Sequence, residues 1–154
     1  MDFKPTIKWL IIFILMPLSF IASADTIVSD QESSQIQLTL QQMAIAWNKG
    51  NLQAFMHGYE NSSSTIYISN AGIVKGYQAI AARYIKHYPN RASMGELSTR
   101  TVDFISLSST DVMVVGSWHI NRIVNHHFDD IGGVFSLIFR NNSQGWHIIV
   151  DHTC

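Results

Sequence analysis

The sequence predicts an α+β fold in which helices occupy the first half of the chain and antiparallel strands occupy the second half. In three segments between residues 36 and 88, apolar residues recur every three or four positions, whereas from Leu97 onward they alternate with a period of two. The 154 residues are 47% hydrophobic and 14% charged, which fits one globular domain and excludes a disordered or collagen-like chain. We expect a cone-shaped, curved antiparallel sheet packed against three N-terminal helices, with a hollow between the layers for a small ligand.

The first 24 residues predict a secretory signal. Lys4 and Lys8 precede an apolar run from Trp9 to Ala22, and Ala22-Ser23-Ala24 is the small-x-small pattern that a signal peptidase accepts. Pro17 interrupts this run, which falls short of the ~20 apolar residues that a spanning helix needs. We therefore expect a signal peptide over residues 1–24 and an exported domain over residues 25–154, periplasmic or secreted, with no stable membrane anchor after cleavage.

Removal of the signal leaves a mildly acidic domain. The signal holds two of the ten basic residues and one of the eleven acidic ones, so eight basic and ten acidic residues remain, for a net charge of −2. Because there is no basic excess to neutralise phosphates, no nucleic-acid partner is expected. The single cysteine, Cys154, cannot form an intramolecular disulfide; it either has no partner or joins two chains.

Three helices are expected. The first runs from a Ser33-Ser34 cap to Gly50, and Asn51 then caps the second. The third follows Gly76 and ends at Pro89-Asn90. Their apolar stripes are Ile36, Leu40, Met43 and Trp47; Leu52, Phe55, Met56 and Tyr59; and Tyr77, Ile80, Tyr84 and Tyr88.

Six strands are expected. The β-branched run Thr65 to Ser69 and a short strand after Asn70-Ala71-Gly72 separate the second and third helices. The four later strands begin at Leu97, Val112, Val134 and Trp146, and the third of these opens at Gly132-Gly133. Apolar and aromatic residues lie on both faces of the last strands. A monomer would leave one face exposed, so we expect a homodimer that buries it.

Short motifs occur in a fixed order along the chain. They are Ala46-Trp47-Asn48-Lys49-Gly50-Asn51-Leu52, Tyr59, Gly76 to Tyr84 with Arg83, Gly116-Ser117-Trp118-His119, Gly133-Val134-Phe135-Ser136-Leu137, Gly145-Trp146-His147-Ile148 and Asp151-His152-Thr153. This ordered set resembles the SnoaL-like, nuclear transport factor 2-like superfamily. It is similar to the domain of unknown function 4440 group, and to the association domain of calcium/calmodulin-dependent kinase II. The resemblance implies a cystatin-like α–β roll over residues 33 to 153.

The resemblance does not extend to the site of ketosteroid isomerase. In that enzyme an aspartate at the end of the first strand moves a proton, and a tyrosine with a protonated carboxylic acid stabilises the enolate. Here Met43 stands where the tyrosine belongs, and the first strand offers Tyr67, Ile68 and Ser69. No Asp or Glu occurs between Glu60 and Glu96. Since the reaction needs a base within reach of the substrate carbon, isomerisation by this arrangement is not expected.

The candidate site combines an aromatic lining with a polar cluster. Arg122 or Arg83 can bind a carboxylate, and His119, Asp151 and His152 are the candidate catalytic residues, in which a His–Asp pair moves a proton. The alternative is that these polar residues are structural or form dimer contacts. The aromatic lining, which also fits an ordinary core, consists of Trp47, Tyr59, Tyr84, Tyr88, Trp118 and Phe135.

No metal site or cofactor is expected. Residues 125–130 gather imidazole and carboxylate groups, but neighbouring residues rarely converge on one ion, and a solvated hairpin loop is the simpler interpretation. The sequence thus predicts an exported small-molecule-binding or dimerisation module without catalysis. The alternative is a small acid–base enzyme, an isomerase, cyclase or hydrolase-like protein, that acts on an apolar or carboxylated compound in the same pocket.

Overall fold

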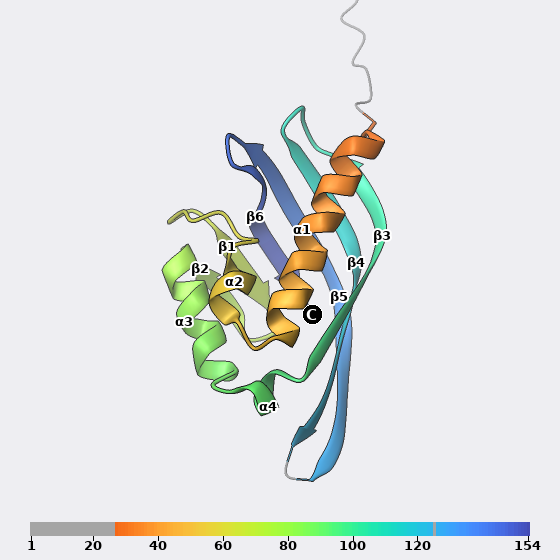
Figure 1. Ribbon diagram of the computed structural model, residues 1–154. Helices are drawn as coiled ribbons and strands as arrows, with labels where there is room; N and C mark the ends of the chain where they lie inside the picture. Colours follow the sequence, from red (N-terminus) through yellow and green to blue (C-terminus); the bar gives the residue numbers. More distant parts are fainter. Residues whose placement is uncertain (1–26, 125) are drawn as a thin grey trace, which may run out of the picture.

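The computed structural model describes residues 27–124 and 126–154 and confirms the α+β fold (Figure 1). The predicted signal peptide lies outside these residues. Helix α1 packs against the curved sheet, α2 and α3 lie on the same side near the β1–β2 edge, and the β4–β5 hairpin projects beyond the helices (Figure 1). None of the helices in the described ranges is long and apolar enough to cross a membrane.

The helices differ from the expected ones mainly at their ends. They are α1 (Asp30–Asn48), α2 (Leu52–Met56), α3 (Tyr77–His87) and a short α4 (Arg91–Met94) that was not predicted. The predicted start of α1 at Ser33-Ser34 is wrong. Ser29 is the N-cap, and its hydroxyl and backbone N–H form a capping box with Glu32. The first turn of α1 is polar, so the apolar stripe gave no sign of it.

All six strands belong to one sheet with the order β2-β1-β6-β5-β4-β3. Neighbouring strands pair antiparallel, except that β1 and β6 are parallel. The strands are β1 (Ile66–Ser69), β2 (Gly72–Lys75), β3 (Glu96–Ser106), β4 (Asp111–Val124), β5 (His127–Asn142) and β6 (Gly145–Thr153).

Strand β5 begins earlier than predicted. It starts at His127 instead of after Gly132-Gly133, and Asp129 and Asp130 pair with Arg122 and Asn121 of β4. The predicted solvated loop over residues 125–130 is therefore largely strand, although Asn125 itself lies outside the described residues. No group of three or more metal-ligating side chains occurs in the described ranges.

A bulge in β6 reverses which side chains face the helices. Ile138 of β5 pairs with Val150, and Phe139 pairs with Ile148, so Ile149 is an extra residue without a pairing partner on β5. Before the bulge, Trp146 and Ile148 are buried. After it, Asp151 is buried at 4% exposure, where uninterrupted alternation would have turned it away.

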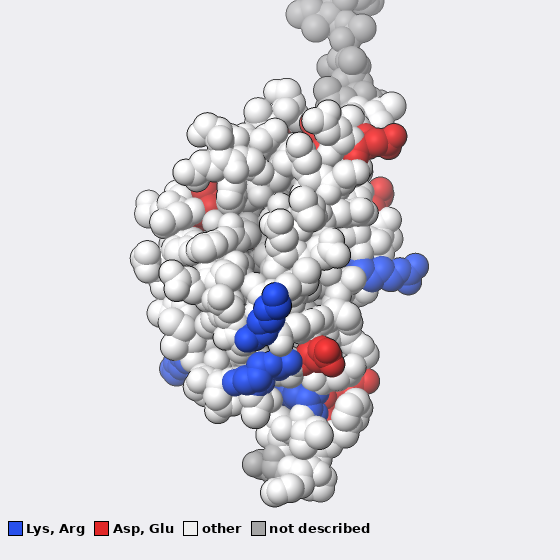
Figure 2. All heavy atoms as spheres, in the orientation of Figure 1, with Lys and Arg blue, Asp and Glu red and all other residues white. Residues whose placement is uncertain are grey.

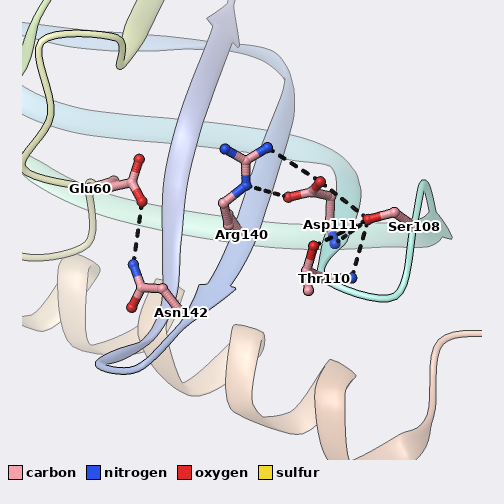
Figure 3. A network of polar contacts seen from close by, with 6 residues as sticks. All are labelled: Glu60, Ser108, Thr110, Asp111, Arg140 and Asn142. Carbon is pink, nitrogen blue, oxygen red and sulfur yellow. Dashed lines mark hydrogen bonds and ion pairs between the residues drawn. The ribbon is translucent and has the colours of Figure 1, made fainter.

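A polar network fixes the β3–β4 turn at the other end of the sheet (Figure 3). The Arg140 guanidinium donates to Asp111 at 2.7 Å, and the Ser108 hydroxyl also donates to the Asp111 carboxylate at 3.1 Å. On the neighbouring connection, the Asn142 amide donates to Glu60 at 3.3 Å (Figure 3). None of these side chains lines the hollow between the helices and the sheet, so they stabilise the turns rather than form a site.

Candidate functional site

A cavity of about 340 Å³ lies between the helices and the curved face of the sheet. This volume falls in the range of small-molecule sites, which are typically concave and mainly apolar. The cavity takes its walls from α1, α2, α3 and from strands β1, β3, β4, β5 and β6. Its aromatic lining residues are Trp47, Phe55, Tyr59, Tyr67, Tyr84, Tyr88, Trp118 and Phe135.

The aromatic wall is held by edge contacts between rings. Trp47 meets the ring of Phe55 at 5.1 Å and that of Tyr88 at 4.7 Å between centroids, both nearly perpendicular. Such geometry places the positive ring edge against a π face and stabilises the pair beyond its buried area. The Trp47 indole N–H also donates to the carbonyl of Met94 at 3.0 Å. The wall is therefore formed before any ligand arrives.

One buried carboxyl group interrupts the apolar lining. The Tyr59 hydroxyl donates to Asp151 Oδ2 at 2.5 Å, and the Thr153 hydroxyl donates to Asp151 Oδ1 at 2.5 Å. The hydroxyls of Tyr59 and Tyr84 are 3.0 Å apart. Because the Tyr59 proton points at Asp151, Tyr84 is the donor in that second bond. We call Asp151, Tyr59, Tyr84 and Thr153 the Asp151 cluster.

Burial governs the protonation of this cluster. It raises the pKa of Asp151, and the hydrogen bonds from Thr153 and Tyr59 together with the positive charge of Arg83 only partly oppose that shift. Burial also raises the pKa of Tyr59 and Tyr84 well above 10, chiefly because a phenolate there would lose its hydration. Both phenols therefore stay protonated at neutral pH, and their protons are held in hydrogen bonds within the Asp151 cluster.

The rim of the cavity on α3 carries two basic residues. By the rim we mean Arg83, which is half-buried, and His87, which is exposed; both line the cavity and lie one helical turn apart. The Arg83 guanidinium lies over the ring of Tyr67, 4.4 Å from its centroid. Figure 2 shows that charged side chains are sparse over much of the helical side of the molecule and are more frequent toward the end with the β4–β5 hairpin. The cavity thus has an arginine at its rim and one buried acidic side chain.

Most of the predicted ligand-binding residues do line the cavity. Trp47, Tyr59, Arg83, Tyr84, Tyr88, Trp118 and Phe135 are all found there. Arg122 is not among the lining residues. Its guanidinium instead donates to Asp129 at 2.7 Å and to the carbonyl of Ser93 at 3.0 Å, so it joins α4 to the β4–β5 hairpin. Of the two arginines considered for a carboxylate, only Arg83 is available in the cavity.

The predicted polar cluster does not form. Asp151 lies in the cavity, but His119 is exposed and meets Asp130 across the β4–β5 pair at 2.7 Å. His152 follows Asp151 and so points away from the helices, where its imidazole lies 3.5 Å from the sulfur of Cys154. The structure therefore separates His119, Arg122 and His152 from Asp151.

Several lining residues were not named as ligand-binding from the sequence. Tyr67 and Met43 were considered only as replacements for isomerase residues, and alternation along the first strand would have placed Tyr67 inward. His87 lies one helical turn beyond Arg83, and that spacing was a usable signal. Thr153 had no such signal, because its inward orientation depends on the β6 bulge.

The fold and the cavity define the class of protein: an α+β roll with an aromatic pocket enclosed between its layers. No family model matches the chain, and no curated protein does. A solved nuclear transport factor 2-like protein of unknown function from Shewanella oneidensis MR-1 is 34% identical, with a TM-score of 0.73 over 79% of this chain and 97% of that chain. The chain therefore belongs to the nuclear transport factor 2-like family.

Two more distant structures share the fold. A ketosteroid isomerase-like protein from Erwinia carotovora atroseptica is 11% identical, with a TM-score of 0.66 over 81% of this chain and 96% of that chain. A putative calcium/calmodulin-dependent protein kinase type II association domain from Thiobacillus denitrificans is 16% identical, with a TM-score of 0.61 over 76% and 91% of the two chains. The resemblance to the domain of unknown function 4440 group stays a prediction from the residues.

Proposed function

We propose that this chain is an exported, non-catalytic small-molecule-binding module that takes an apolar, ring-containing compound between its helices and its sheet. The observation that carries the proposal is the aromatic cavity of about 340 Å³, which is preformed and already holds polar groups for orienting a ligand. Its walls are fixed by ring–ring contacts and by the Trp47 hydrogen bond, so a ligand would order few side chains on binding.

Binding accounts for the cavity better than catalysis does. Asp151 is the one carboxyl side chain among the described lining residues, and each of its oxygens already accepts a hydroxyl hydrogen bond. No described imidazole hydrogen-bonds to it, since His119 pairs with Asp130 and His152 lies beside the sulfur of Cys154. A proton shuttle needs an acid–base group free to approach the substrate, and these contacts hold Asp151 in place.

We also propose a homodimer formed through the outer face of the sheet, opposite the helices. This face is apolar at its centre, where Val102 and Val134 are 69% and 64% exposed beside the half-buried Val115. A shallow groove runs among these side chains. The same face of a second copy is equally apolar, and a two-fold pair covers both at once.

The binding proposal is tested by calorimetry with a neutral ring compound, 2-naphthamide. We expect the protein to bind it, and an Ala44→Phe variant to weaken binding at least about tenfold, because Ala44 lines the cavity and the added ring fills it. Ile45→Phe is the matched control, since Ile45 is the next residue of α1, is 46% exposed and lies outside the lining. Equal binding by both variants, or no binding by the unmodified protein, would overturn the proposal.

A further inference from the structure

We infer that the ligand carries a carboxylate, which pairs with Arg83 at the rim while the apolar body lies against the aromatic wall. This inference rests on the proposed function and names the chemical class of compound that the cavity takes. The contacts of Arg83, the shape of its guanidinium and the charge balance of the cavity each support it.

The Arg83 guanidinium has no polar partner among the described residues. Within residues 27–124 and 126–154 it forms no hydrogen bond or ion pair, and it lies over the Tyr67 ring. By contrast, Arg122 and Arg140 pair with Asp129 and Asp111, each at 2.7 Å. Arg83 is half-buried beside the cavity, so its N–H groups are left for a group that enters from solvent.

The guanidinium geometry favours a carboxylate. The guanidinium lies over the Tyr67 ring and makes no hydrogen bond within the described residues, so its N–H groups are free to donate. A carboxylate matches two parallel N–H donors, and such a charge-assisted pair is about twice as strong as a neutral hydrogen bond. Because the guanidinium is already held against the ring, less side-chain entropy is lost when the pair forms.

The charge balance of the cavity points the same way. Asp151 is the acidic side chain that lines the cavity with Arg83, but its two oxygens already accept hydrogen bonds from Tyr59 and Thr153. Asp151 forms no ion pair with Arg83 among the described residues. A guanidinium stays charged at every accessible pH. An anionic group on the ligand would give Arg83 the ionic partner that it lacks there.

The test compares two compounds of nearly the same shape, 2-naphthoate and 2-naphthamide, by calorimetry at neutral pH. We expect the unmodified protein to prefer the carboxylate by roughly tenfold or more, the range of a charge-assisted hydrogen bond. Arg83→Met, which keeps an apolar stem on Tyr67, should reduce this preference to within about twofold. Lys86→Met removes the same charge from the exposed side of α3, outside the lining, and should change neither affinity.

The possible outcomes separate this inference from the proposed function. Binding of 2-naphthamide without a preference for 2-naphthoate overturns the carboxylate and leaves the binding module standing. A preference that survives Arg83→Met, or that Lys86→Met removes equally, also overturns it. Retained binding of 2-naphthamide by Arg83→Met shows that the variant is folded. Failure of both compounds to bind the unmodified protein overturns both proposals together.

Discussion

At the scale of single residues, Asp151 depends on a feature that the sequence does not reveal. Alternation along the last strand groups Asp151 with His147 and Ile149, on the face opposite Trp146 and Ile148. The extra residue Ile149 brings Asp151 onto the same side as Ile148 instead. A bulge depends on how two strands pair, and no local pattern of side chains specifies it here. Asp151 therefore lies in the cavity, apart from the imidazoles of His119 and His152 with which the sequence grouped it.

The burial of Asp151 makes a prediction about pH. Its pKa is raised in the folded protein, so between the unfolded value of about 3.9 and the folded value the native state binds more protons than the unfolded state does. The free energy of unfolding therefore falls as the pH rises through that interval. In Asp151→Asn this contribution is absent, so the stability of the unmodified protein relative to the variant should decline from about pH 4 upward.

Urea unfolding at a series of pH values measures this difference. Asp103→Asn serves as the control. Asp103 is an exposed strand residue outside the Asp151 cluster, and its carboxylate accepts the N–H of Phe104. The pH profile of this variant should run parallel to that of the unmodified protein. A difference between the protein and Asp151→Asn that stays constant with pH would contradict the prediction.

At the scale of elements, the apolar stripes located the helices but not their ends. Ser33-Ser34 precedes the first stripe residue, Ile36, so the pattern predicts the cap there, whereas the extra turn before it is held by the capping box of Ser29 and Glu32. Capping depends on a few hydrogen bonds and not on burial, so hydrophobic periodicity is insensitive to it.

This difference can be tested directly. We expect Ser29→Ala to lower the free energy of unfolding by about 1 kcal/mol, because a backbone N–H of the first turn loses its acceptor. The melting temperature should fall by a few degrees. Ser34→Ala, at an exposed position within the helix, should have little effect. If Ser34→Ala costs as much as Ser29→Ala, the helix starts where the sequence pattern placed it.

The glycine pair of β5 shows a second limit of sequence patterns. Gly132-Gly133 was interpreted as the opening of a strand, yet both residues lie within β5. A Cβ on Gly133 would lie 1.7 Å from the carbonyl oxygen of Cys154, and one on Gly132 would lie 2.5 Å from the His119 ring. These glycines therefore permit close approach between strands. Sequence alone does not distinguish this role from a turn, because both require the absence of a side chain.

At the scale of the whole molecule, the order of elements was predictable because each long element carries its own apolar pattern. The aromatic lining was predictable for a related reason, since large apolar side chains on helix and strand faces converge wherever two layers meet. The polar residues were not predictable in the same way. His119 and Arg122 pair with carboxylates on the neighbouring strand, and those pairs depend on the β4–β5 register.

The outer face of the sheet leads to a prediction about assembly. We expect the exported protein to begin near Asp25, which its intact mass would show. We also expect light scattering to give the mass of a dimer. Val134→Asp, at the centre of the outer face, should yield a monomer, because two buried carboxylates would face each other across the two-fold axis. Ile73→Asp is the control, since Ile73 is 72% exposed on β2, away from that centre. A monomeric unmodified protein, or a dimer that survives Val134→Asp, would refute this arrangement.

Two of the lining residues give the cavity its own optical reporter. Trp47 and Trp118 both border the space that the ligand would occupy, whereas the indole of Trp146 is held by Gln35 on the other side of α1. Indole emission shifts with the polarity of its surroundings, so replacing cavity water with a ring compound alters the intrinsic fluorescence without any added label. Replacing Trp118 by Phe would then leave Trp47 as the remaining reporter at the cavity wall, so the position of a bound compound can be followed from one side at a time.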